Sequence, residues 1–305
     1  MIEIIQRLIT THNDQDVIEY EIKHKNGFSV SVQNYGGVIS KIMTPDKYGA
    51  MQNVVLSAQE FDSINQFHLG AITGRVAGRI KNGMFSLNSC NYSLKTNNGP
   101  NHLHGGLSGF NQKFWKVKKL FNGLELSYLS LHNDESYPGE LLVKISYLIS
   151  NNYELTIQTE MICDSDSIAN ITNHSYFDLS AGIDPMSMEL QIHADYFAPI
   201  DKDGCVINQL QKVENTHFDF RQPKSINYAF NQPDEQMIIA NYGYDHPFLL
   251  NQNINHAVYL ADKNHTGITL KIITDEPCCV IYTSNWLKPQ KHAGICFETQ
   301  KMPND

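Results

Sequence analysis

Residues 153–161, Tyr153-Glu-Leu-Thr-Ile-Gln-Thr-Glu-Met161, alternate apolar and polar side chains. A period of two is typical of a β-strand, because successive side chains of a strand point to opposite faces. Asn151-Asn152 just before this stretch is a turn signal, and residues 143–149 alternate in the same way. The two runs therefore predict a β-hairpin. The apolar side chains expected on one face of its second strand are Tyr153, Leu155, Ile157 and Met161.

The same pattern recurs along the chain. Asn26-Gly27 precedes an alternating run at 28–32, Asn122-Gly123 precedes one at 124–131, and residues 268–273 form another. Short helices are expected only at residues 57–65 and 234–240. Strands without intervening amphipathic helices favour antiparallel sheets over a βαβ architecture. With no repeat or linker to divide the chain, the sequence predicts one large all-β sandwich domain over residues 1–305.

The composition excludes several classes of partner. The chain has 23 basic and 32 acidic residues, a net charge of −9, and so no basic surplus with which to bind nucleic acid or an anionic membrane. No apolar run approaches the roughly 20 residues of a membrane span. Six cysteines occur without a C-x-x-C pair, which favours reduced thiols and a cytoplasmic location.

Two polar segments interrupt the strands in the first half of the chain. Residues 74–80 carry Arg75 and Arg79, whose spacing in an extended segment directs both to one face. Guanidinium groups suit vicinal hydroxyls or carboxylates, although either arginine alone is more often a surface or ion-paired residue. Residues 101–106 carry His102 and His104, a familiar metal-binding spacing, but no carboxylate follows to complete such a site. Either histidine alone is more often a core or loop residue than a ligand.

Three further polar segments lie in the second half of the chain. His174 is flanked by Asn173, Ser175 and Tyr176, which could fix its tautomer, although a structural histidine with satisfied hydrogen bonds is the default interpretation. Asp245 precedes His246-Pro247 and could accept hydrogen bonds from hydroxyl groups or form an Asx-turn. Glu298 follows the apolar run 293–296, where burial would raise a carboxyl pKa, although a strand-end surface glutamate is the default interpretation.

Taken in order, these segments resemble the aldose 1-epimerase (galactose mutarotase) family from about Val17 to Pro303. The most specific matches are Asn101-His-Leu-His-Gly-Gly106, residues 173–179, Tyr244-Asp-His246 and Glu298-Thr-Gln300. The resemblance implies a β-supersandwich fold and an isomerase that interconverts sugar anomers. It implies Glu298 as general base and His174 as general acid. The sugar-contacting positions that it implies are Arg79, His104, Tyr176 and Asp245, with Arg75 in support of Arg79.

The implied reaction is acid–base ring opening and reclosure of a free hexose such as galactose or glucose. No electron or group is transferred, so neither a cofactor nor a metal is expected. The expected partner is a small aldose sugar, and the expected oligomeric state is a monomer or a homodimer.

The sequence departs from the family pattern at three places. Gly78 stands where many members have Asn, and Val280 stands where some have Gln, which leaves the preferred hexose open. Relatives usually continue beyond Pro303 into at least one more strand, so either this segment is lacking or the sequence is truncated.

Three alternatives remain at this point. A hexose-6-phosphate 1-epimerase would need basic residues for the phosphate. A non-catalytic sugar-binding module would not need a matched acid and base. A metal-dependent hydrolase would be built on His102 and His104.

Overall fold

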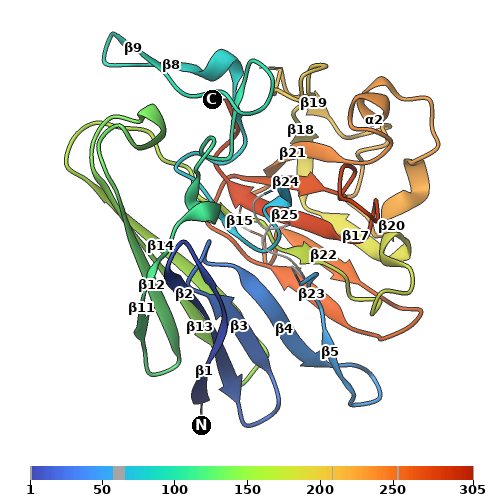
Figure 1. Ribbon diagram of the computed structural model, residues 1–305. Helices are drawn as coiled ribbons and strands as arrows, with labels where there is room; N and C mark the ends of the chain where they lie inside the picture. Colours follow the sequence, from blue (N-terminus) through green and yellow to red (C-terminus); the bar gives the residue numbers. More distant parts are fainter. Residues whose placement is uncertain (1, 58–65, 208, 253, 305) are drawn as a thin grey trace. The chain divides into compact units, whose positions relative to one another are not determined.

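The computed structural model describes residues 2–57, 66–207, 209–252 and 254–304, and the regular secondary structure among them is mostly β-strand (Figure 1). Strand pairings among these residues are antiparallel, apart from an isolated parallel bridge between Val76 and Asn170. The predicted helix at 234–240 is present as α2 (Glu235–Ile239), where the Asp234 carboxylate caps the first turn. The other predicted helix, at 57–65, lies outside the described residues except for Ser57.

The chain divides into two compact units. Unit 1 comprises Met1–Pro45, Met51–Asn53 and Ser57–Asn173, and unit 2 comprises Asp46–Ala50, Val54–Leu56 and His174–Asp305. The single domain expected over residues 1–305 stays a prediction.

Unit 1 contains a five-stranded sheet (β1-β2-β3-β4-β5), a four-stranded sheet (β11-β12-β13-β14) and three two-stranded pairs (β10-β7, β15-β6 and β8-β9). Short 3₁₀ turns lie at Lys81–Gly83, Phe110–Gln112 and Asp134–Ser136. The strands are β1 (Ile2–His12), β2 (Gln15–His24), β3 (Ser29–Gln33), β4 (Ile39–Pro45), β5 (Met51–Asn53), β6 (Ile72–Thr73), β7 (Arg79–Ile80), β8 (Met84–Leu87), β9 (Cys90–Ser93), β10 (His102–Leu103), β11 (Lys116–Lys119), β12 (Gly123–Ser130), β13 (Leu141–Ile149), β14 (Leu155–Cys163) and β15 (Thr172–Asn173).

The two larger sheets of unit 1 meet across an apolar core. Every second residue of β13 is buried, and the buried Tyr147 donates a hydrogen bond from its hydroxyl to the Gly37 carbonyl at 3.1 Å. Gly37 has φ +57°, and a Cβ there would lie 2.1 Å from Ile72 Cδ1. Only glycine therefore fits this close approach.

The predicted hairpin is confirmed as β13 and β14, with Ile149 opposite Leu155. Tyr153 lies in the turn rather than in the strand, because its φ is +61°. Ile157 and Met161 lie opposite the buried Tyr147 and Val143, as the alternation predicts, yet each remains 42% exposed. Their exposure follows from the edge position of β14, which has a neighbouring strand on one side only.

Unit 2 contains a six-stranded sheet (β16-β25-β24-β21-β18-β19) and a four-stranded sheet (β20-β17-β22-β23). Its 3₁₀ turns lie at Pro185–Ser187 and Ile226–Ala229. The strands are β16 (Tyr176–Phe177), β17 (Glu189–Ile192), β18 (Ala194–Phe197), β19 (Gln211–Lys212), β20 (Lys224–Ser225), β21 (Asp245–Leu250), β22 (Val258–Ala261), β23 (Thr269–Ile272), β24 (Cys278–Tyr282) and β25 (Ile295–Gln300).

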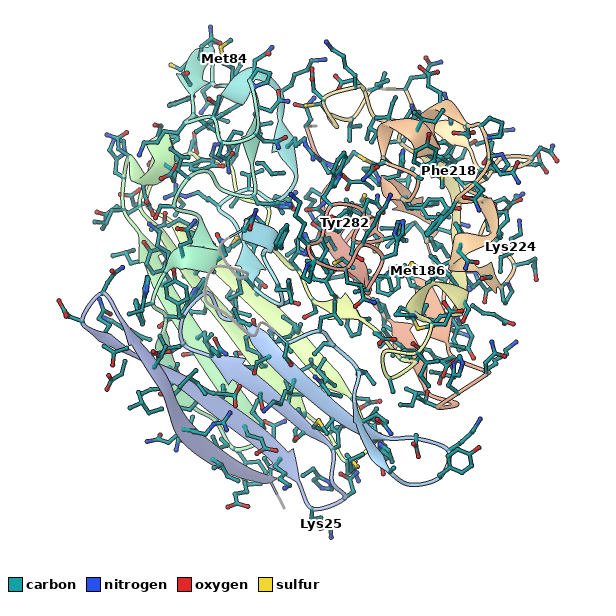
Figure 2. The ribbon with its side chains drawn as sticks, turned by 45° about the vertical axis from the view of Figure 1, so that its right-hand side comes forward. Lys25, Met84, Met186, Phe218, Lys224 and Tyr282 are labelled. Atoms are coloured by element: carbon teal, nitrogen blue, oxygen red, sulfur yellow. The ribbon has the colours of Figure 1, made fainter. Side chains whose placement is uncertain are left out.

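An aromatic cluster fills the core of unit 2 beside the six-stranded sheet. The rings of Phe197 and Phe218 stack with centroids 4.0 Å apart, and Phe218 also contacts His246 edge-on. Figure 2 labels Phe218 within unit 2. Such pairs stabilise a core beyond their buried area. The cluster fixes the strands whose opposite face carries the ionisable residues described next.

Candidate active site

The six-stranded sheet of unit 2 brings polar residues from four strands onto one face. Its register aligns Tyr176, Cys296, Tyr282 and Asp245 in one row across β16, β25, β24 and β21. Glu298 lies two residues beyond Cys296 on β25, and therefore on the same face, opposite Val280. We call this set the acid–base face: Tyr176, Asp245, Tyr282, Cys296 and Glu298.

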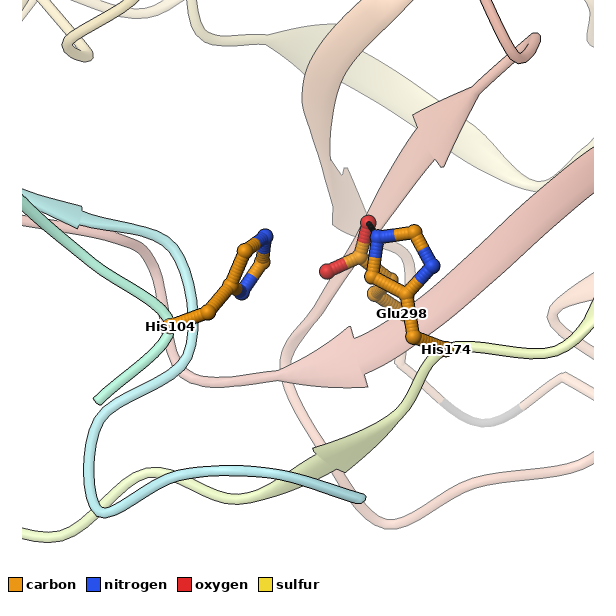
Figure 3. Close-up of side chains that lie close together, drawn as sticks. All are labelled: His104, His174 and Glu298. Carbon is orange, nitrogen blue, oxygen red and sulfur yellow. Dashed lines mark ion pairs between the residues drawn. The ribbon is translucent and has the colours of Figure 1, made fainter. Parts of the chain in front are cut away.

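His174 and Glu298 form a buried pair on this face. The His174 Nε2 and Glu298 Oε1 atoms are 3.5 Å apart, and the two residues are 4% and 3% exposed (Figure 3). Glu298 lies within β25 rather than after it, which accounts for its burial. A protonated imidazole beside a carboxylate is a matched acid and base, the two groups that opposing proton transfers require.

The second ring nitrogen of His174 also has a partner on β25. His174 Nδ1 lies 3.5 Å from the sulfur of Cys296. The rings of Tyr176 and Tyr282 flank the imidazole, with centroids 5.0 and 6.0 Å from it. Contacts therefore reach the His174 ring from three strands. Sequence reasoning missed Cys296, although its position two residues before Glu298 was a usable signal.

Both tyrosines of the acid–base face carry neutral hydroxyl groups. Burial raises the pKa of Tyr176 well above its usual value, and the negative charges nearby raise it further. Burial likewise raises the pKa of Tyr282. Each phenol therefore keeps its proton at any ordinary pH and can donate a hydrogen bond to a bound hydroxyl group.

Unit 1 holds the predicted residues Arg79 and His104 on adjoining segments. β7 pairs with β10 so that Arg79 lies opposite Leu103, directly before His104. The backbone N–H of His104 donates to the Gly78 carbonyl at 3.1 Å, and the Gly78 N–H donates to His104 Nδ1 at 3.3 Å. The Arg79 Nε–H donates to the Asn98 side chain at 3.0 Å. These bonds fix the direction of both side chains.

The comparisons with known proteins agree on one family. A family model described as aldose 1-epimerase matches residues 19–305. Galactose mutarotase of Sus scrofa is 34% identical over 291 residues, covering 90% of this chain and 83% of that protein. Aldose 1-epimerase of Haemophilus influenzae is 31% identical, covering 97% and 90%. The crystal structure of galactose 1-epimerase from Lactobacillus acidophilus superposes with a TM-score of 0.89 at 30% identity, covering 100% and 93%.

The chain belongs to the aldose 1-epimerase family. The resemblance, the galactose mutarotase-like β fold and the mutarotase function predicted from sequence are thereby confirmed. The epimerase is an enzyme, a carbohydrate isomerase. Among the described residues, no helix reaches the length and apolarity that a membrane span requires.

Arg75 has a different role in the epimerase from the one expected. Its guanidinium is buried and donates hydrogen bonds to the Pro138 carbonyl at 2.8 Å and to the Ser130 hydroxyl at 2.7 Å. The expectation that Arg75 supports Arg79 is therefore wrong. The two side chains part because the segment is not a continuous strand: Gly78, with φ +75°, turns the chain between them. Arg75 instead links the two ends of the segment 130–139 through these hydrogen bonds.

His102 is a structural histidine in the epimerase. Its Nδ1 lies 2.6 Å from the Lys95 carbonyl and its Nε2 lies 2.6 Å from the Tyr137 hydroxyl. Burial lowers the pKa of His102 and keeps the ring neutral, so one nitrogen donates and the other accepts. Because protein groups engage both nitrogens, His102 does not suit the metal-binding role considered from its spacing with His104.

Within unit 2, the buried pair offers one imidazole nitrogen and one carboxylate oxygen. Opposing proton transfers need only two groups, one acid and one base, and the pair supplies both.

Proposed function

We propose that Glu298 is the general base and His174 the general acid in interconversion of the α and β anomers of free hexoses. The observation that supports the assignment is the 3.5 Å separation of Glu298 Oε1 and His174 Nε2 on a buried sheet face. Groups this close can both reach the anomeric centre of one sugar, where O1 and the ring oxygen O5 are bonded to the same carbon.

The proposed reaction moves two protons and changes no oxidation state. Glu298 takes the proton of the O1 hydroxyl while His174 gives a proton to O5, and the C1–O5 bond breaks. The open aldehyde rotates about C1–C2. O5 then attacks the other face of C1, His174 recovers its proton from O5, and Glu298 returns one to O1. A well-placed acid or base contributes about 10²–10⁴-fold in rate. Because no electron or group is transferred, we propose that the reaction needs no cofactor.

The remaining hydroxyl groups of the sugar need partners that hold C1 in register with the pair. We propose Tyr176 and Asp245 on the acid–base face and Arg79 and His104 from unit 1. The tyrosine and arginine supply donors and the aspartate supplies an acceptor. Galactose and glucose are the proposed substrates, and galactose is supported by the names of the relatives from Sus scrofa and Lactobacillus acidophilus.

The cellular location, the binding partners and the oligomeric state of the enzyme are also proposals. The six cysteines all lie among the described residues and none forms a disulfide, which supports a reducing, cytoplasmic location. The acidic net charge of −9 supports the absence of a nucleic-acid or anionic-membrane partner. We propose a monomer or a homodimer.

Polarimetry on freshly dissolved α-D-galactose and α-D-glucose tests the function. The wild type should speed the approach to the equilibrium rotation, and Glu298→Gln and His174→Ala should largely lose this effect. Glucose 6-phosphate serves as a competitor in the same assay. Strong inhibition at concentrations below those at which glucose competes would favour a phosphosugar substrate, and a wild type that matches the buffer blank on several aldoses would refute the proposal.

A further inference from the structure

Two side chains of one strand, β25, contact the two nitrogens of the His174 ring. Cys296 Sγ lies 3.5 Å from Nδ1 and Glu298 Oε1 lies 3.5 Å from Nε2. Cys296 and Glu298 are two residues apart on β25 and therefore point to the same face. Cys296 and His174 are both buried, so water does not compete for the Nδ1 position.

The partner of Nδ1 decides which nitrogen of a neutral imidazole carries the proton. A carbonyl or carboxylate at Nδ1 would hold a proton there, and the neutral ring would then have none on Nε2. A thiol can instead donate its S–H to Nδ1 or accept a hydrogen bond from it. Burial raises the pKa of Cys296 well above its usual value, and the negative charges of Glu298 and Asp245 raise it further, so the sulfur keeps its proton.

We propose that Cys296 is a positioning residue that keeps the exchangeable proton of His174 at Nε2, an inference that rests on the proposed role of His174 as general acid. In the neutral ring of the free enzyme, the Cys296 S–H donates to Nδ1 and leaves the N–H at Nε2, next to Glu298. In the protonated ring, the sulfur accepts a weak hydrogen bond from Nδ1–H. Once Nε2 has given its proton to O5, the ring keeps Nδ1–H, which still donates to the sulfur, and Nε2 is free to recover the proton when the sugar ring closes. The contact therefore holds the ring in one orientation in each of its protonation states.

A thiol also differs from a carboxylate in its effect on acidity. A carboxylate at Nδ1 would stabilise the imidazolium and make His174 a weaker acid. A neutral thiol orients the ring without adding a charge. Glu298 is then the charged group that pairs with Nε2, the nitrogen that exchanges protons with the substrate in the proposed reaction.

Cys279 provides a matched control. It is fully buried like Cys296 and lies on the adjacent strand β24, opposite Thr299, so its side chain points to the other face of the sheet. Cys279→Ala removes the same atom from an equally buried position without touching the His174 ring.

The experiment compares Cys296→Ala, Cys296→Ser and Cys279→Ala by polarimetry and by nitrogen-15 NMR of the histidine rings. We expect Cys296→Ala to lower kcat about tenfold with KM nearly unchanged, because one orienting hydrogen bond is lost. Cys296→Ser should recover most of kcat, since a hydroxyl also donates and accepts. Above the pH at which the ring titrates, the wild type and Cys296→Ser should show the proton on Nε2 of His174, whereas Cys296→Ala should show a mixture of tautomers.

Two outcomes would overturn the inference: wild-type kcat and tautomer in Cys296→Ala, or an equal loss of kcat in Cys279→Ala. If Cys296→Ala does not fold, the tautomer in Cys296→Ser decides, and a proton on Nδ1 there contradicts the proposal. Failure of the proposed function is distinguishable, because it would appear as wild-type activity in His174→Ala.

Discussion

The two faces of the six-stranded sheet in unit 2 are made by the same strands, yet they differ in chemistry. The acid–base face places Glu298 beside His174. The opposite face, which we call the aromatic face, packs rings against one another around a single histidine, His246. Its members are Phe177, Phe197, His246, Phe248, Ile281 and Phe297.

The histidines associated with the two faces show what this difference means. The His246 ring accepts a hydrogen bond from the Asp245 N–H and contacts the Gln236 side chain, and burial lowers its pKa to about 3. The His174 ring contacts a thiol and a carboxylate. Burial is shared by both residues, so burial alone does not distinguish a candidate acid from a structural histidine. The two histidines differ in that His174 has an acidic partner, Glu298, beside its ring.

The largest effect that would sharpen this comparison is expected on the aromatic face. Phe248→Ala removes a ring that is 1% exposed and should lower the free energy of unfolding by about 3–5 kcal/mol. Urea denaturation measures the loss, while kcat of the folded fraction should stay within about twofold. A loss below about 1 kcal/mol would mean that this face does not carry the stability of the sheet.

The next effect is a pH dependence of stability caused by His246. Its pKa is about 3 when folded and near 6.5 when unfolded. Between these pH values His246 binds a proton in the unfolded chain but not in the folded one. The contribution of His246 to the free energy of unfolding is therefore fully present above pH 6.5 and is lost as the pH falls towards 3. The loss is about 1.4 kcal/mol for each pH unit.

His246→Gln tests this contribution by denaturation at several pH values. The variant should be less stable than wild type at neutral pH, yet its stability should fall less steeply between pH 6.5 and about 4. Other groups, such as the buried His68 with a pKa of about 4, are common to both proteins and cancel in the difference. Parallel curves would show that His246 does not set the acid sensitivity.

A smaller effect is expected from Tyr176→Phe on the acid–base face. Loss of the neutral hydroxyl should lower kcat/KM about tenfold through one missing hydrogen bond to the sugar. The free energy of unfolding should change less than in Phe248→Ala, because the ring and its packing are kept. Polarimetry and urea denaturation on the same sample separate the two effects. If the variant loses stability but keeps kcat/KM, Tyr176 contributes to the packing of the core and does not bind the sugar.

The smallest effect is expected from Val280→Gln. Val280 lies opposite Glu298 on the acid–base face and is 7% exposed. An amide at this position should offer the sugar one more hydrogen bond and lower KM for galactose about threefold. KM for glucose, measured in parallel, shows whether the gain is selective. A fall in kcat with no change in KM would indicate that the longer side chain disturbs Glu298 instead.

Local pattern was enough to predict much of the fold. The alternation in β13 and β14 and the Asn-Gly turns before β3 and β12 follow from side-chain geometry over a few residues. Edge and interior positions could not be predicted in this way. Met161 and Val143 have the same pattern and face each other, but only the first is exposed, because strand order depends on the whole sheet.

The candidate site could be predicted only through the resemblance to a family. His174 and Glu298 are distant in sequence, and no local period indicates that they meet. Arg75 and Arg79 share a spacing and a residue type, yet a turn at Gly78 sends the first into the interior. The Cys296 contact depends on the register of β25 beside β16, which is a property of the folded sheet.

The central claim, that Glu298 and His174 act as one acid–base unit, is tested most directly by a double-mutant cycle on kcat/KM. Polarimetry would compare wild type, Glu298→Gln, His174→Ala and the double variant, with denaturation curves confirming that each is folded. Because both protons move in one ring opening, each single variant should lose about 10²–10⁴-fold and the double variant should be about as slow as the slower single variant. A double variant slowed by the product of the two single losses, or a single variant with wild-type activity, would contradict the account.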